Sequence, residues 1–261
     1  MPAPSVLAVY AHPDDESLAA GGILARHAAA GARTAVVTAT WARDSHRAAE
    51  LADALALLGV AAEPRMLGYA DHRVPDSAPG QPRFCDAPLG EAVERLVAHI
   101  RDFRPDIVVS HDAHGSSGHP DHVHTHRVTL LAAHAAGRPD LHPVAGPPWR
   151  PGALYLSAHP DPDPATAILA GLVASVGKRL HTVPAALVGA AVDVRPWADR
   201  KWAAIRAHRS EAVRSRSLPA LLGGLPAPER EVVLGTEYFI RHDLVPARRG
   251  RRDSVPSGGT A

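Results

Sequence analysis

The chain has 261 residues, of which 46% are hydrophobic, and its formal net charge is +1. This composition is typical of a globular protein with one large core, and it gives no electrostatic reason to expect nucleic acid or an anionic membrane as a partner. The single cysteine, Cys85, excludes an internal disulfide and a cysteine-rich zinc cluster.

Strand-like and helix-like segments alternate along the first 158 residues. Apolar runs predict strands at 5–11, 33–40, 106–110 and 152–157, and a short third strand is expected at 63–67. Helical periodicity predicts helices at 17–30, 45–58, 89–103 and 121–136. The proline-containing stretch 70–87 is expected to form a loop. After residue 158 the pattern weakens, and it predicts only a strand at 190–194 and a helix at 197–208.

Strands that alternate with helices in this way predict a mostly parallel sheet with right-handed crossovers. We therefore expect a Rossmann-like, three-layer α/β fold in a single domain over residues 1–245. The last stretch, 246–261, is basic and then polar, and we expect it to be disordered. No apolar run reaches the about 20 residues of a membrane span, and no basic-then-apolar leader opens the chain, so the expected location is the cytoplasm.

Two clusters of polar residues follow predicted strands. The first strand runs directly into His12-Pro13-Asp14-Asp15-Glu16, and the strand 106–110 runs into "HDAHGSSGHPDH" at 111–122. Because ligands bind at the carboxyl ends of parallel strands, both clusters are expected at the same edge of the sheet. A dinucleotide site is excluded, because carboxylates stand where G-x-G-x-x-G would be and would repel a polyphosphate. A divalent cation would instead stabilise clustered carboxylates and accept imidazole nitrogens.

The segments "AHPDDES" and "GHPDH" together resemble the paired signature of the PIG-L/LmbE-like zinc N-deacetylases, which hydrolyse N-acetylglucosaminyl conjugates and related amides. The resemblance extends over roughly residues 5–240, with further matches at "LGYADH", around Arg47 and at "KWAAIRAHRSE". It implies an enzyme with one Zn²⁺ per chain, although another divalent transition metal stays open.

The resemblance also implies roles for single residues. His12, Asp15 and His122 would be the metal ligands, and Asp14 would be the base that takes a proton from the attacking water. His119 would face the developing oxyanion or protonate the leaving amine, and Asp121 would orient an imidazole. Contacts with the sugar would come from Arg47, Asp71 and His208.

Structural roles compete with several of these assignments. Asp14 and Asp15 could cap the following helix, since carboxylates accept hydrogen bonds from its free N–H groups. Glu16 could provide first-turn acidity or support a ligand. His111 could form a second metal pair with His114, but solvation in the loop is the simpler interpretation.

Two positions depart from the family pattern. Ser117 stands where some sugar deacetylases carry a tyrosine that could steady the oxyanion. Glu211 ends the C-terminal motif where glutamine is commoner. The role of each position is therefore left open by the sequence.

The resemblance favours removal of an acetyl or similar acyl group from an N-acetyl amino sugar conjugate, such as a glucosaminyl-inositol thiol precursor or an aminoglycoside or glycopeptide intermediate. An aromatic content of 4% offers few stacking platforms for a long polysaccharide, so the expected partner is a small soluble glycoside. Three alternatives stay open: an amidase of thiol S-conjugates, a metal-dependent phosphoesterase, and a non-catalytic metal- or sugar-binding protein. The sequence does not fix the oligomeric state.

Overall fold

The computed structural model describes residues 3–245. Its strands are β1 (Val6–Tyr10), β2 (Thr34–Thr40), β3 (Arg65–Tyr69), β4 (Ile107–Ser110), β5 (Ala153–Ala158), β6 (Pro160–Asp161), β7 (Val183–Pro184), β8 (Ala190–Asp193) and β9 (Thr236–Asp243). The main sheet has the order β3-β2-β1-β4-β5-β9-β8. Strands β1 to β5 pair in parallel, whereas β9 is antiparallel to both β5 and β8. The expected α/β fold with a mostly parallel sheet is confirmed.

The helices lie close to their expected bounds in the first half of the chain. They are α1 (Asp15–Ala29), α2 (His46–Leu58), α3 (Leu89–Phe103), α4 (Gly115–Gly118), α5 (Pro120–Ala136), α6 (Pro164–Ser175), α7 (Ala198–Ala207), α8 (Arg209–Ala212), α9 (Leu218–Gly223) and α10 (Ala227–Leu234). Short 3₁₀ helices cover Pro75–Ser77, Phe84–Asp86, Pro143–Ala145, Ala185–Leu187 and Arg195–Trp197. The sequence did not predict β9, α6, α9 or α10. The expected disordered tail, 246–261, lies outside the described residues.

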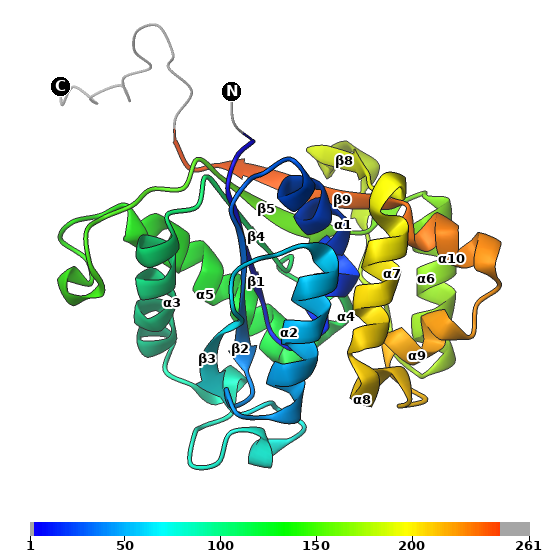
Figure 1. Cartoon of the computed structure of the whole chain (residues 1–261), viewed down its shortest axis with the longest axis horizontal. Coiled ribbons are helices and arrows are strands. Elements are labelled where there is room, and N and C mark those ends of the chain that lie inside the picture. The colour runs from blue at the N-terminus through cyan, green and yellow to red at the C-terminus, as the bar shows by residue number, and fades with distance from the viewer. Residues whose placement is uncertain (1–2, 246–261) are drawn as a thin grey trace, which may run out of the picture.

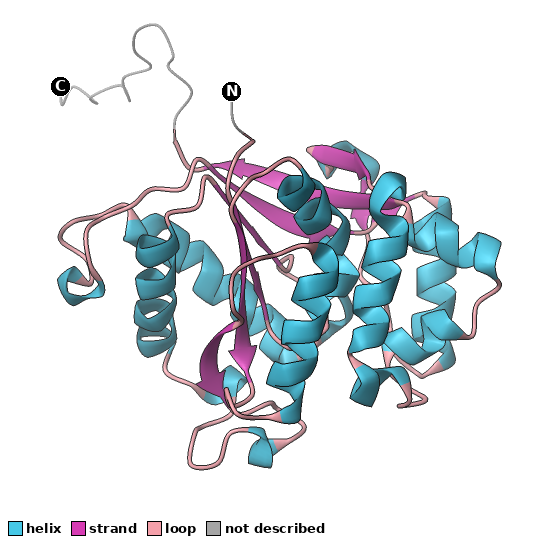
Figure 2. Cartoon of the chain, viewed as in Figure 1, coloured by secondary structure: helices cyan, strands magenta, loops and turns pink. Residues whose placement is uncertain are grey.

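Helices cover both faces of the main sheet, which gives three layers (Figures 1 and 2). One face packs against α3 and α5, and the other packs against α1, α2 and α7. The small helices α6, α9 and α10 gather beyond α7, at the side of the molecule farthest from α3 (Figure 1). Among residues 3–245, no helix combines the length and the apolar character that a bilayer crossing requires.

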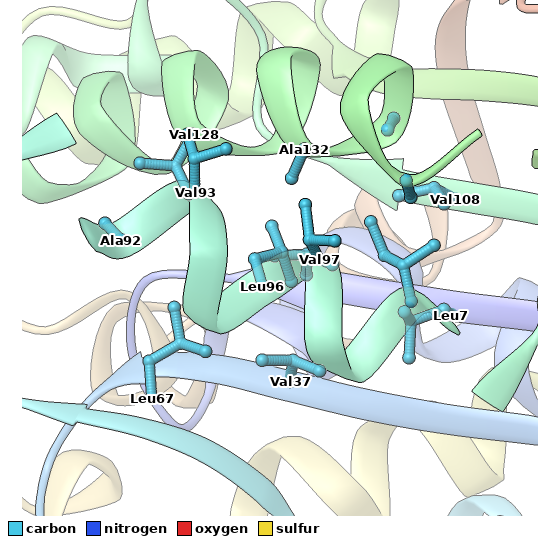
Figure 3. Packing of buried hydrophobic residues seen from close by; sticks show 14 of the residues in the cluster. Leu7, Val37, Leu67, Ala92, Val93, Leu96, Val97, Val108, Val128 and Ala132 are labelled. Carbon is cyan, nitrogen blue, oxygen red and sulfur yellow. The ribbon is translucent and has the colours of Figure 1, made fainter. Parts of the chain in front are cut away.

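Alternating side chains of β1 enter two separate cores, because successive residues of a strand point to opposite faces. Leu7 packs with Leu96 and Val97 of α3, as Figure 3 shows, whereas Ala8 packs with Leu24 of α1. Every residue of β1 is buried, as expected for a central parallel strand with both faces covered.

A single arginine organises the loop that follows α5. Arg101 is only 2% exposed. Its guanidinium donates hydrogen bonds to backbone carbonyls of Ala135, Ala136, Arg138, Leu141, His142 and Gly146.

The helix α1 is tied to the last strand of the sheet. The carboxylate of Glu237 in β9 accepts hydrogen bonds from the backbone N–H groups of Gly22 and Ile23, at 2.7 and 2.9 Å. Lys201 of α7 donates to the same carboxylate at 2.7 Å. A methyl group on Gly22 would lie 2.4 Å from Cβ of Val194, so only glycine allows this close approach.

The order of the strands reverses direction between β1 and β4. From β1 the chain adds β2 and β3 on one side, and from β4 it adds β5 on the other. Ligands in open α/β sheets bind at the crevice that such a switch point opens beyond the carboxyl ends of the strands. The residues that follow β1 and β4 are therefore the ones to consider for a site.

Candidate metal centre and active site

Two ring nitrogens and one carboxylate oxygen converge at the switch point between β1 and β4. Nδ1 of His12 lies 3.2 Å from Nε2 of His122 and 3.3 Å from Oδ2 of Asp15. Nε2 of His122 lies 3.4 Å from the same Asp15 oxygen. His12 follows β1, Asp15 begins α1, and His122 lies in the first turn of α5, so the sheet brings together donors from two distant parts of the chain.

The second nitrogen of each histidine ring already has an acceptor. Nδ1 of His122 donates to the carbonyl oxygen of Gly115 at 3.2 Å. Nε2 of His12 faces the Asp121 carboxylate at 3.1 Å. With their protons held there, the lone pairs of both rings point toward each other and toward Asp15. An imidazole that ligates a metal is held in this way by an acceptor on its far nitrogen.

The spacing and charge of these atoms fit a zinc ion. Tetrahedral ligands at about 2.0–2.1 Å from zinc lie roughly 3.3–3.4 Å from one another. The three observed separations span 3.2–3.4 Å. Burial lowers the pKa of His12, but hydrogen bonds to Asp121 and Asp15 raise it well above its ordinary value. The surroundings of His12 therefore favour a cation at this point.

Asp14 lies beside these atoms in a strained turn. Its φ of 130° is a conformation that residues other than glycine rarely adopt. The turn is held by Glu16, whose carboxylate accepts the Asp14 N–H at 2.9 Å, and by Arg47, which donates to the carbonyl of Pro13. Burial raises the pKa of Asp14 to about 7, and the adjacent Asp15 charge adds to the rise while Arg47 opposes it.

His119 is the N-cap residue of α5. Its Nδ1 accepts the backbone N–H of Asp121 at 3.3 Å, so the proton of the neutral ring is on Nε2. Burial, together with the charges of His12 and Arg73, lowers the pKa of His119 to about 3. Its ring centroid lies 4.8 Å from those of both His12 and His122. His119 is thus a neutral hydrogen-bond donor at the edge of the three-atom cluster.

Two further carboxylates face His12. Asp121 is fully buried, and its second oxygen accepts the backbone N–H of Cys85 at 3.1 Å, which fixes its position. Asp71 reaches the same ring nitrogen of His12 at 3.4 Å and lines the cavity described below. Asp121 therefore contacts the far nitrogen of the His12 ring, and its orienting role stays a prediction.

Of the residues expected to contact the sugar, Asp71 and Arg47 line the cavity and His208 does not. Arg47 lines the cavity, but its guanidinium is engaged by Asp14 at 3.3 Å and by Glu211 at 2.5 Å. His208 is fully buried, and its ring bonds Oε1 of Glu16 at 2.9 Å. His208 does not line the cavity, so its position does not fit the expected contact with a sugar. It instead supports the carboxylate that holds Asp14.

The interpretation of His111 as a solvated loop residue is wrong. His111 is 2% exposed, its Nε2 lies 3.4 Å from Asp15, and its ring stacks on His122 at 4.1 Å between centroids. Its place directly after β4 was the signal that could have revealed this. His114 is exposed and stacks on His181 instead.

A cavity of about 260 Å³ opens over the cluster. The predicted ligands and Asp14, His119, Asp71 and Arg47 all line it. Ser117 and Glu211, the two positions expected to depart from the family pattern, also line it. The arrangement places a carboxylate with a raised pKa, a neutral imidazole donor and the three converging donor atoms of His12, Asp15 and His122 around one open space.

The chain is similar to a known protein family and to proteins named as deacetylases. The family model described as "PIG-L: GlcNAc-PI de-N-acetylase" matches residues 7–133, which include both histidine-containing segments. A 1D-myo-inositol 2-acetamido-2-deoxy-alpha-D-glucopyranoside deacetylase of Geodermatophilus obscurus is 34% identical over 290 residues, covering 97% of this chain and 95% of the relative.

Two solved structures share the fold. The conserved protein TT1542 from Thermus thermophilus superposes with a TM-score of 0.64 at 23% identity, covering 98% of this chain and 100% of that one. The N,N'-diacetylchitobiose deacetylase from Pyrococcus horikoshii gives a TM-score of 0.62 at 20% identity, covering 92% and 84%.

Proposed function

Because the chain belongs to the PIG-L family of de-N-acetylases, we propose that it is a metal-dependent hydrolase that removes the acetyl group from an N-acetyl amino sugar conjugate. We take its catalytic unit to be a single domain over residues 1–245. The relatives named as 1D-myo-inositol 2-acetamido-2-deoxy-alpha-D-glucopyranoside deacetylases suggest a small glycoside of N-acetylglucosamine as the substrate.

The observation that carries this proposal is the convergence of the His12 and His122 lone pairs on Asp15, with both far ring nitrogens engaged by acceptors. These three residues would hold one Zn²⁺ per chain. When bound, the ion would polarise the amide carbonyl and acidify water for attack.

The chain's own residues supply the proton transfers of the reaction. Hydrolysis adds water across the amide C–N bond and releases acetate and a free amine. Asp14, whose pKa is raised to about 7, would accept a proton from the attacking water and return it to the leaving amine. Nε2–H of His119 would donate a hydrogen bond to the oxygen of the carbonyl as it gains negative charge.

The remaining residues would position these groups and the substrate. Asp71 lines the cavity and is proposed to bind a sugar hydroxyl. Arg47 is proposed to act mainly on Asp14, since it is ion-paired with that carboxylate. Asp121 is proposed to hold the His12 ring in the orientation that leaves Nδ1 free.

The proposal is tested with zinc-loaded protein and a panel of methyl, inositol and S-conjugate derivatives of N-acetylglucosamine. Release of acetate in equal amount with free amine supports N-deacetylation. Release of phosphate from sugar phosphates with no acetate would indicate a phosphoesterase, and binding without any release would indicate a non-catalytic protein. Either of these results would overturn the proposal.

A further inference from the structure

The cavity over the site continues into a space walled by aliphatic side chains. These come from four helices: Leu18 of α1, Leu169 and Val173 of α6, Leu222 of α9 and Val233 of α10. We call this part of the cavity the aliphatic chamber. Leu169 and Val173 are each 8% exposed and Leu222 is 1% exposed, so the walls are well shielded from bulk water.

The walls of the chamber belong to two packed clusters that share Val233. Leu169 and Val173 belong to one cluster, and Leu222 belongs to another with Ile205 and Leu234. Val233 packs against both clusters and also lines the cavity. The helices concerned stand together beyond α7 (Figure 1). Closing them onto one another would bury more apolar surface, so an open space between them has a cost unless a ligand fills it.

The chamber begins one helical turn from the catalytic carboxylates. Asp14 and Asp15 open α1, and Leu18 follows three residues after Asp15 on the same face, with all three side chains lining the same cavity. Three residues of helix span about 4.5 Å. An acyl group whose carbonyl is placed for attack beside Asp14 would therefore bring its next carbons to the chamber entrance.

The sugar itself does not suit the chamber. Its hydroxyl groups need hydrogen-bond partners, and moving them against aliphatic walls would leave them unpaired. Asp71, which lies 3.4 Å from Nε2 of His12, and Arg73, whose backbone N–H donates to the Asp71 carboxylate, line the cavity beside the proposed metal ligands. Apolar cavities of this kind stay dry and accept apolar ligands. Only an aliphatic part of the substrate matches the chamber in chemistry.

We propose that the chamber binds a linear aliphatic chain carried by an N-acyl amino sugar, so that the preferred substrate is larger and more apolar than a simple acetyl glycoside. This inference rests on the proposed N-deacylase function. The chain could belong to the acyl group that is removed or to the aglycone of the sugar. Both sources present the same methylene groups to the chamber.

Two substrate series distinguish the sources. In the first, methyl glucosaminide carries N-acetyl, N-butanoyl, N-hexanoyl or N-octanoyl groups, and in the second, N-acetylglucosamine carries methyl, butyl, hexyl or octyl aglycones. The free amine released gives kcat/KM for each member. In the series that enters the chamber, kcat/KM should rise by up to about fourfold per methylene until the chamber is full. A rise in the first series assigns the chamber to the acyl group, and a rise in the second assigns it to the aglycone.

A matched pair of variants on α10 links the preference to the chamber. Val233→Phe would fill part of it, whereas Val232→Phe makes the same change at the next residue, which is 45% exposed and does not line the cavity. In the series that enters the chamber, the ratio of kcat/KM for the six-carbon member over the shortest member should fall by about tenfold or more in Val233→Phe and stay unchanged in Val232→Phe. Val233→Ala, which enlarges the chamber, should move the optimum to a longer chain and covers the case in which the phenylalanine variant does not fold.

Failure of this inference differs from failure of the proposed function. If acetyl substrates are hydrolysed but kcat/KM is flat or falls along both series, the chamber proposal is wrong while the deacetylase proposal stands. If no substrate is hydrolysed, the deacetylase proposal is wrong, and calorimetric binding of octyl N-acetylglucosaminide decides the chamber proposal alone. Binding that weakens in Val233→Phe and not in Val232→Phe supports the chamber, and equal or absent binding overturns it.

Discussion

Two regions of the molecule bury charge in opposite ways. Behind the sheet, the Arg101 guanidinium is satisfied by six backbone carbonyls and, among residues 3–245, forms no ion pair with a carboxylate. At the switch point, Asp14, Asp15 and Glu16 are buried side by side, which costs free energy by desolvation and mutual repulsion.

The two regions also differ in how completely their polar atoms are paired. In the described part of the chain, the buried side-chain atoms without a partner include Nε of Arg47, Nδ1 of His111 and Nδ1 of His208, all in or beside the site. Asp14 adds backbone strain. A polar group that serves only the fold is fully paired, whereas a site keeps unpaired atoms and like charges together for a ligand.

Removal of a converging donor should have the largest effect. His122→Ala takes away one of three proposed ligands, so zinc content should fall from about one per chain to near zero and activity should be lost. His114→Ala, which changes an exposed histidine of the same loop, is the control and should keep its zinc. Elemental analysis with acetate release measures both, and full zinc in His122→Ala would mean that the ligands are assigned wrongly.

Asp14→Asn and His119→Ala should separate catalysis from metal binding. Each variant should retain about one zinc per chain and lose on the order of 10²–10⁴-fold in kcat, the usual scale for a positioned acid or base. Asn has the shape of the protonated carboxyl, so Asp14→Asn should fold normally. Zinc loss in Asp14→Asn would instead make Asp14 a ligand.

Substitution of Arg101 should change the stability of the protein and leave its catalytic rate unchanged. Arg101→Met leaves six carbonyls without their donor, and we expect the free energy of unfolding to fall by about 3 kcal/mol. Arg138→Ala removes an exposed ion pair from the same loop and should leave the free energy of unfolding nearly unchanged. Denaturant titration measures both, and kcat of the folded Arg101→Met protein should equal that of the wild type. A lower kcat would show that the two regions are coupled.

His208→Ala tests whether this buried histidine acts on substrate or on Asp14. Because it bonds Glu16, which holds the Asp14 N–H, its loss should lower kcat by about tenfold and leave KM and zinc content unchanged. His208→Gln, which keeps a donor, should restore part of the rate. A rise in KM with kcat unchanged would return His208 to the sugar-binding role that its sequence motif suggested.

The smallest expected effect is a loss of stability at low pH that depends on His99 of α3. Burial, together with the charges of Arg65 and Arg43, lowers the pKa of His99 in α3 to about 4. The unfolded chain then binds more protons at this residue than the folded one, so stability is present above pH 6.5 and is lost as the pH falls toward 4. Between about pH 7 and pH 5 the loss should be about 1–2 kcal/mol, and it should be absent from His99→Gln. An identical pH dependence in both proteins would contradict this assignment.

The sequence predicted β1, β2, β4 and β5 well because each is a short apolar run bounded by turn residues. The third strand, expected at 63–67, lies at Arg65–Tyr69, because a segment with charged residues and a proline gives no clear apolar signal. It missed β9, whose Glu237 and Phe239 are buried while the residues between and after them are less so, because an antiparallel strand with mixed burial resembles many surface segments. It missed α6 because that helix is apolar around most of its surface and has no clear stripe.

The candidate site could also be predicted only in part from the sequence. The resemblance carried by two short motifs was enough to expect His12, Asp15 and His122 to lie together, and their side chains do converge. The partners of His208 and Arg47 could not be predicted, because contacts with Glu16 and Glu211 join segments more than 160 residues apart. Such pairings depend on how α1, α2 and α7 pack together.

The link between α1 and β9 affects how the protein can be made. The N–H groups of Gly22 and Ile23 lack their acceptor until Glu237 is synthesised, more than 200 residues later. A nascent chain that already contains both histidine motifs therefore still lacks the carboxylate that anchors its first helix. Because translation adds roughly 5–20 residues per second, that helix would stay without its anchor for at least about ten seconds of synthesis.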